Sequence, residues 1–83
     1  MKIVYFAWVR ERIGKESETV TLPEGIETVA DLLGWLKRRG EGYAEALAHA
    51  QMIRVAIDHE HVQHDTRLPA QGEIALFPPM TGG

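Results

Sequence analysis

Residues 2–8 read KIVYFAW, a run of β-branched and aromatic side chains that is typical of a β-strand. Successive side chains of a strand point to opposite faces, so Ile3 and Tyr5 would lie on one face and Phe6 on the other. A strand that is apolar on both faces belongs in the interior of a sheet. We therefore predict that residues 2–8 form a central strand, around which the rest of the chain folds.

The segment that follows predicts a hairpin and then a helix. Residues 17–22 alternate polar and apolar side chains, as expected of a strand that pairs with the first one. Thr28 is a good helix N-cap because Asp31 stands three residues later, which gives a capping box with Asp in place of the usual Glu. Apolar residues then recur at helical spacing as far as the basic residues 37–39, and Gly40 is a natural stop. The main helix is therefore expected between Thr28 and Gly40.

Shorter elements are predicted along the rest of the chain. They are one helical turn at residues 9–13, a weaker helix at 41–50, and strands at 52–57, around Val62 and at 73–77. Strands on both sides of a helix, with no internal repeat or linker, indicate one α+β domain. Trp8 and Trp35 are most simply packing residues.

The composition narrows the classes of function. A formal net charge of −3 argues against a surface that binds nucleic acid, because such proteins usually carry a basic excess on one face. Without cysteine, the chain has no disulfide, no thiolate nucleophile and no cysteine-ligated metal site. No segment approaches the run of about 20 apolar residues that spans a membrane. We therefore expect no nucleic acid or membrane among the partners, and a cytoplasmic location by default.

The C-terminal end of the sequence carries the chemical signal. The double proline at 78–79 fixes φ near about −65° and removes two backbone donors, so the chain must leave the sheet. Gly82 and Gly83 have no Cβ, so this end can thread a narrow channel and a nucleophile can approach the terminal carbonyl. A carboxylate is a poor electrophile, so a partner would have to activate it, most plausibly as an acyl-adenylate, before sulfur could displace the activating group. We expect residues 1–77 to form the domain and residues 78–83 a flexible tail.

The ending LFPPMTGG at residues 76–83 resembles that of the small subunit of molybdopterin synthase, the MoaD family. The stretch FAWVRE at residues 6–11, followed by Gly14, also looks like the first strand and turn of that family. Length, element order and the Thr28-capped helix agree, so the resemblance covers the whole chain.

The resemblance implies a single beta-grasp domain, ubiquitin-like, with a mixed sheet packed on one main helix. It implies that an E1-like adenylating enzyme uses ATP to activate the terminal glycine, and that a persulfide sulfurtransferase supplies the sulfur of a thiocarboxylate. The loaded tail would enter the large subunit of molybdopterin synthase and donate sulfur to cyclic pyranopterin monophosphate, in a heterotetramer of two small and two large subunits. The chain would hold no permanent cofactor and would not be an enzyme on its own.

The resemblance also assigns roles to particular residues. Gly83 would bear the adenylate and then the thiocarboxylate, while Gly82, Thr81 and Met80 would line the inserted tail. The partner-binding positions would be Phe6, Arg10, His61, Phe77, Pro78 and Pro79. His61 departs from the family, in which the matching position is usually aliphatic. Independently, Phe6 and Phe77 fall on the face opposite the predicted core, where aromatic side chains often mark a contact surface.

Other residues allow alternative interpretations. His59, His61 and His64 could be metal ligands, but they miss the spacing of the HExxH motif, and a solvated hairpin explains them better. We predict no metal site, and the sequence leaves the role of these histidines open. Five early acidic residues are interpreted as a solvated surface and not as a catalytic pair: Glu11, Glu16, Glu18, Glu24 and Glu27.

Further functions stay open on the residues alone. The diglycine end also suits a ubiquitin-like modifier that forms isopeptide bonds with lysines, or a sulfur carrier for thiamin or tRNA thiolation. A plain interaction domain with an incidental Gly-Gly end is a third class. The spacing of the FPPxxGG ending favours the carrier for molybdenum cofactor synthesis.

Overall fold

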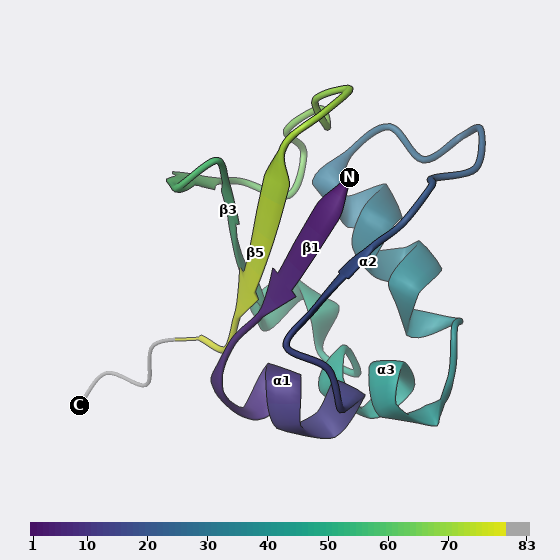
Figure 1. The fold of residues 1–83 in the computed structure, drawn as a ribbon, viewed down its shortest axis with the longest axis vertical. Coiled ribbons are helices and arrows are strands. Elements are labelled where there is room, and N and C mark those ends of the chain that lie inside the picture. The colour runs from purple at the N-terminus through teal and green to yellow at the C-terminus, as the bar shows by residue number, and fades with distance from the viewer. Residues whose placement is uncertain (80–83) are drawn as a thin grey trace.

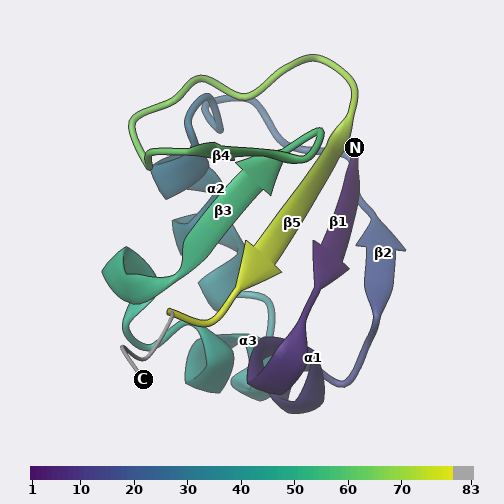
Figure 2. The same ribbon diagram turned by 90° about the vertical axis from the view of Figure 1, so that its left-hand side faces the viewer.

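Five strands form one mixed sheet with helices against one of its faces, as the computed structural model of residues 1–79 shows (Figures 1 and 2). The elements are β1 (Lys2–Tyr5), α1 (Ala7–Ile13), β2 (Ser17–Thr19), α2 (Val29–Lys37), α3 (Glu41–Ala46), the short 3-10 helix η1 (Ala50–Met52), β3 (Arg54–Ile57), β4 (Glu60–Val62) and β5 (Glu73–Phe77). The strand order is β2-β1-β5-β3-β4, with β1 and β5 parallel and the other neighbours antiparallel. This is the predicted α+β class, a beta-grasp domain built on one main helix.

The first strand is interior, as predicted, but it is shorter than predicted. It ends at Tyr5, Phe6 is still extended, and the positive φ of 51° at Ala7 marks the corner at which α1 begins. The extension to residue 8 was wrong because a helix carries the following apolar side chains to the core equally well, and Val9 is fully buried there. Alternation alone cannot separate these two cases.

Helix α2 begins as predicted, with both hydrogen bonds of the Thr28–Asp31 capping box present. Its end differs, because the helix stops at Lys37 and Arg38 is the C-cap. Gly40 is therefore not the residue that ends this helix; it is the extended N-cap of α3. The face of α2 toward the sheet is apolar and packs on the inward side chains of the strands. The fully buried large side chains are Ile3, Tyr5, Val9, Val29, Leu32, Leu33, Leu36, Leu47, Val55, Ile74 and Leu76.

The segment between α2 and β3 holds two short helices instead of the one predicted. The predicted helix at 41–50 ends at Ala46, and η1 occupies residues that we had assigned to the end of the helix and the start of the next strand. Strand β3 consequently begins at Arg54. Trp8 and Trp35 are half-buried against the core, which confirms their packing role. No helix within residues 1–79 has the length and apolar character needed to cross a membrane.

Candidate functional site

Three predicted partner-binding residues meet on the sheet face that the helices leave uncovered. The rings of Phe6 and Phe77 stack with their centroids 5.0 Å apart and an interplanar angle of 8°. The ring of His61 lies 5.6 Å from that of Phe77. The parallel register, in which Tyr5 is paired with Leu76, brings Phe6 beside Phe77, and the Phe6 N–H donates to the Leu76 carbonyl at 3.1 Å. The two aromatic residues, far apart in sequence, are thus fixed by the central strand pair.

These rings form one wall of a surface groove of about 530 Å³, which we call the sheet-side groove. Its lining consists of Phe6, Ala7, Arg54, His61, Phe77, Pro78 and Pro79. Five of the six predicted partner-binding residues therefore share this groove. Phe6 is 40% exposed, and it is one of two large apolar residues within residues 1–79 that are exposed.

Arg10 is the predicted partner-binding residue that lies outside the groove. It is on α1, where its guanidinium approaches the carboxylate of Glu16 at 4.0 Å, and both side chains are exposed. Arg54 takes part in the groove instead, because the antiparallel pairing of β3 with β5 sets it opposite Phe77. Its outward position could have been found from the alternation of β3, in which Val55 points to the core.

The end of the chain that is predicted to react lies beyond the described part. Met80, Thr81, Gly82 and Gly83 are outside residues 1–79, so their roles stay predictions, as does the boundary between domain and tail. The described chain ends at Pro79, which is in the wall of the sheet-side groove directly after β5.

The three histidines are not gathered at one place. His61 stacks on Phe77, while Nε2 of His64 lies 2.7 Å from the carbonyl oxygen of Ile53. His64 is half-buried, so the prediction of a solvated side chain was wrong for it, whereas His59 is exposed in the turn between β3 and β4. Residues 1–79 contain no grouping of three or more His, Asp or Glu side chains that could hold a metal ion.

Sequence reasoning missed a polar cluster around Glu18. The hydroxyls of Tyr5 and Tyr43 both donate to its Oε2 at 2.6 Å. Lys15 Nζ and Arg39 Nη1 donate to its Oε1 at 3.3 and 3.0 Å. The side chain of Glu18 is only 10% exposed, so its assignment to a solvated acidic surface was wrong. The available signal was Tyr5, a core-facing residue whose hydroxyl needs a partner.

These contacts set the charge of the cluster. Burial alone would raise the pKa of Glu18, but hydrogen bonds from Tyr43, Tyr5 and Arg39 outweigh it and lower that pKa from its ordinary 4.5 to about 2. Burial and the hydrogen bond to Glu18 raise the pKa of the Tyr5 hydroxyl. A carboxylate with so low a pKa and four hydrogen-bond donors is a poor general base. Its role is structural, because its hydrogen bonds connect β2 with α3 and with the segment after α2.

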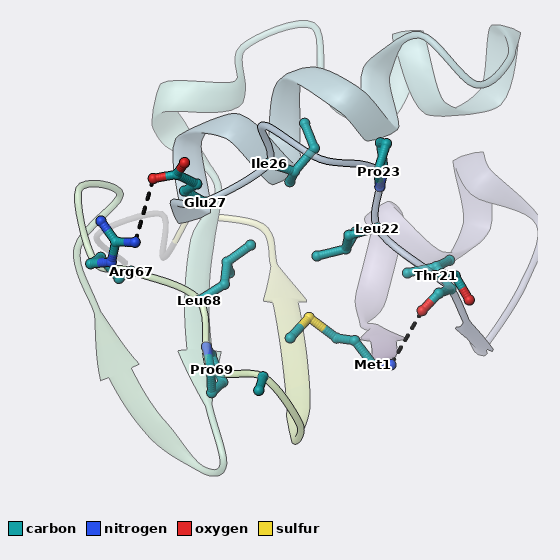
Figure 3. A pocket seen from close by; sticks show the side chains of 11 residues that line it. Met1, Thr21, Leu22, Pro23, Ile26, Glu27, Arg67, Leu68 and Pro69 are labelled. Atoms are coloured by element: carbon teal, nitrogen blue, oxygen red, sulfur yellow. Dashed lines mark hydrogen bonds and ion pairs between the residues drawn. The ribbon is translucent and has the colours of Figure 1, made fainter.

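Another hollow, of about 440 Å³, lies at the opposite end of the sheet (Figure 3). It is flanked by Met1, which precedes β1, and by residues 67–70, which precede β5. Its charged groups are already partnered: Arg67 pairs with Glu27 at 3.4 Å, and the terminal ammonium donates to the Val20 carbonyl at 3.2 Å. None of the predicted site residues lines it.

Comparison of the sequence with known families finds one match that runs through the diglycine end. A model of the ThiS family matches residues 3–83. The chain is 32% identical over 84 residues to the molybdopterin synthase sulfur carrier subunit of Dictyostelium discoideum, covering 99% of this chain and 94% of that protein. It is 31% identical over 83 residues to the subunit of the same name from Escherichia coli, and the match covers 100% of this chain and 99% of that protein.

Comparison of the fold points to the same kind of small domain. The crystal structure of small archaeal modifier protein 1 from Haloferax volcanii superposes with a TM-score of 0.72 and 28% sequence identity, covering 96% of this chain and 97% of that one.

Proposed function

The chain belongs to the ThiS family, and from this premise we propose that it is a sulfur carrier whose C-terminal residue, Gly83, is the site of loading. One observation carries the proposal: the family match extends from residue 3 to Gly83, so it includes the diglycine as well as the folded domain. The relatives named sulfur carrier subunits of molybdopterin synthase match over nearly their full lengths.

The proposed chemistry follows from the weakness of a carboxylate as an electrophile. An E1-like enzyme transfers AMP from ATP to the carboxylate of Gly83 and releases pyrophosphate. The terminal sulfur of a sulfurtransferase persulfide then attacks the carbonyl carbon and AMP leaves, which gives an acyl disulfide between Gly83 and the sulfurtransferase. A second thiol of a partner enzyme attacks the sulfurtransferase sulfur of this acyl disulfide, so that the thiocarboxylate is released and the two thiols end as a disulfide. In the large synthase subunit this thiocarboxylate donates its sulfur to cyclic pyranopterin monophosphate. The chain supplies the reacting carbonyl, and its partners supply the catalytic groups.

The described residues support a role in which the chain docks onto a partner that supplies the catalytic groups. The sheet-side groove lies where the chain passes to its last residues, and it is lined by apolar rings and two prolines. Such a groove suits docking onto the large subunit, with Phe6, Phe77 and His61 as the anchoring side chains. Met80, Thr81 and Gly82 are proposed to fill the channel of the partner. A side chain on either glycine would widen the tail next to the reacting carbonyl.

Removal of Gly83 tests the proposal at the reacting residue. Deleting Gly83, or adding one residue after it, should abolish sulfur loading by the activating enzyme and sulfurtransferase. The thermal unfolding curve should stay nearly unchanged, because glycine has no side chain to bury in the core. Intact-mass measurement of the loaded product reads the result. Normal loading of the deletion variant would sink the proposal.

A second function is favoured by the likeness to small archaeal modifier protein 1. In that case the activated carbonyl of Gly83 would form an isopeptide bond with a lysine of another protein. Immunoblots of native cells separate the two functions. A ladder of conjugates that vanishes when Gly83 is deleted supports the modifier, whereas a thiocarboxylate without conjugates supports the carrier.

A further inference from the structure

A second groove, of about 410 Å³, opens between α1, the end of α3 and η1, and we call it the helix-side groove. Its apolar lining includes Trp8 and Met52, and its polar lining includes Arg12, Glu45 and His49. The guanidinium of Arg12 lies 4.5 Å from the centroid of the Trp8 ring, which holds both side chains in the wall.

The two grooves meet at Pro79, which lines both of them. Pro79 is also the last described residue, so the described part of the chain ends between the two grooves. Within residues 1–79 only two large apolar side chains are exposed, Phe6 at 40% and Met52 at 55%. Phe6 lines the sheet-side groove and Met52 lines the helix-side groove. The exposed apolar side chains of the described domain therefore flank the point where the tail begins.

The charged side chains that line the two grooves are mostly basic, whereas the whole chain has a negative formal net charge. The two grooves are lined by Arg12, Arg54, His49 and His61 and by a single acid, Glu45, although the chain has a formal net charge of −3. Within residues 1–79 neither Arg12 nor Arg54 forms a salt bridge. Two uncompensated arginines beside apolar grooves complement a surface that is apolar with acidic residues at its edge.

We propose that the helix-side groove is a second docking surface for the large synthase subunit, which contacts Trp8 and Met52 with the rim of the channel that receives the tail. This inference rests on the proposed function. A channel that takes the chain from Pro79 onward has to close around Pro79, so its rim must rest on both grooves. The acidic edge of that rim lies against Arg12 and Arg54.

Isothermal titration of the full-length chain with the large subunit tests the inference. Met52→Glu places a charge in the helix-side groove and should weaken binding roughly tenfold. Gln71→Glu is the matched control, because it adds the same charge at an exposed position in the loop before β5, at the opposite end of the sheet. The dissociation constant of this control variant should stay within about twofold of that of the native chain. Met52 is more than half exposed, so both variants should unfold at the native temperature.

Two further measurements keep the outcomes distinct. Arg12→Gln should weaken binding and make it less dependent on salt, as expected if this arginine faces acidic residues. Phe77→Asp should abolish binding through the sheet-side groove. Native affinity of Met52→Glu alongside loss of binding by Phe77→Asp would overturn the inference and leave the proposed function standing. Failure of the native chain to bind the large subunit at all would overturn both.

Discussion

Glu18 holds a negative charge among four donors. Each of its carboxylate oxygens accepts two hydrogen bonds, Oε2 from two tyrosine hydroxyls and Oε1 from Lys15 and Arg39. The partners come from β1, the turn before β2, the segment after α2, and α3, so one side chain on the short edge strand β2 connects four parts of the chain. Hydrogen bonds to a charged acceptor are stronger than those between neutral groups. The cluster therefore stabilises an edge of the sheet that has only three strand residues.

Replacement of Glu18 should reveal this contribution. Glu18→Gln should lower the free energy of unfolding at pH 7 by about 2 kcal/mol, because a neutral amide pairs poorly with two cations and two hydroxyl donors. The folded pKa of about 2 lies below the ordinary 4.5, so the stabilisation is present above pH 4.5 and is lost as the pH falls toward 2. Urea unfolding at several pH values should show the difference between native chain and variant shrink over this window.

Glu16→Gln is the control for that change. The Glu16 carboxylate is 86% exposed and lies 4.0 Å from Arg10, so its loss should alter the free energy of unfolding by less than about 0.5 kcal/mol. Equal effects of the two substitutions at pH 7 would show that the Glu18 cluster is not a stabilising feature.

Helix α2 shows how an element can be fixed by both near and distant partners. Its first four N–H groups are all satisfied: Val29 and Ala30 donate to the carbonyls of Thr66 and His64, while the next two donate to Thr28. The Asp31 carboxylate accepts from the Glu27 and Thr28 N–H groups, and these backbone hydrogen bonds lower its pKa. The start of the helix is thereby joined to the loop between β4 and β5.

Loss of the cap should weaken the domain measurably. Thr28→Ala removes the side-chain acceptor for the Asp31 N–H and should lower the free energy of unfolding by about 1 kcal/mol. Thr28→Ser keeps the hydroxyl and should stay close to the native value. Chemical denaturation of the three chains in parallel compares them. An alanine variant as stable as the serine variant would mean that the loop carbonyls alone hold the start of the helix.

Local signals predicted some boundaries of the elements and failed at others, and features decided by distant contacts were missed. The capping box of Thr28 lies within four residues and placed the start of α2 correctly. Gly40 also carried a local signal, yet the helix ended earlier, at Lys37, and Gly40 became the cap of the next helix. The end of β1 was missed because a strand and a helix both bury an apolar run. Glu18 was missed because its partners lie up to 25 residues away in the sequence.

At the scale of the molecule, the parallel pairing of β1 with β5 organises the candidate site. It places Phe6, near the start of the chain, against Phe77, near the end of β5. Figure 2 shows the sheet from the side that the helices leave uncovered. The domain thus brings one aromatic stack and two grooves to the point where the tail begins. The other hollow, beside Met1, lies at the far end of the sheet.

The site could be predicted only in part from the sequence. Strand alternation indicated that Phe6 and Phe77 face away from the core, and the family resemblance added His61 and the two prolines. Arg10 was assigned to a position near the same face; it is on α1, outside the sheet-side groove, and it pairs with Glu16 of the segment that follows this helix. The outward position of Arg54 could have been found from the alternation of β3, but its place beside Phe77 depends on the β3–β5 register. Met52 was missed because its position depends on η1, which no short-range pattern specifies.

The central claim is that Gly83 carries sulfur as a thiocarboxylate. The most direct test is the intact mass of the chain purified from its native, sulfur-replete cells, with fragmentation to locate any added mass. Only a C-terminal Gly83 has a free carboxylate to load with sulfur. The same mass spectrum shows whether Gly83 is the last residue of the chain. We expect a fraction heavier by one exchange of oxygen for sulfur, with the change confined to Gly83. A single unmodified mass in those cells, or sulfur located elsewhere in the chain, would contradict it.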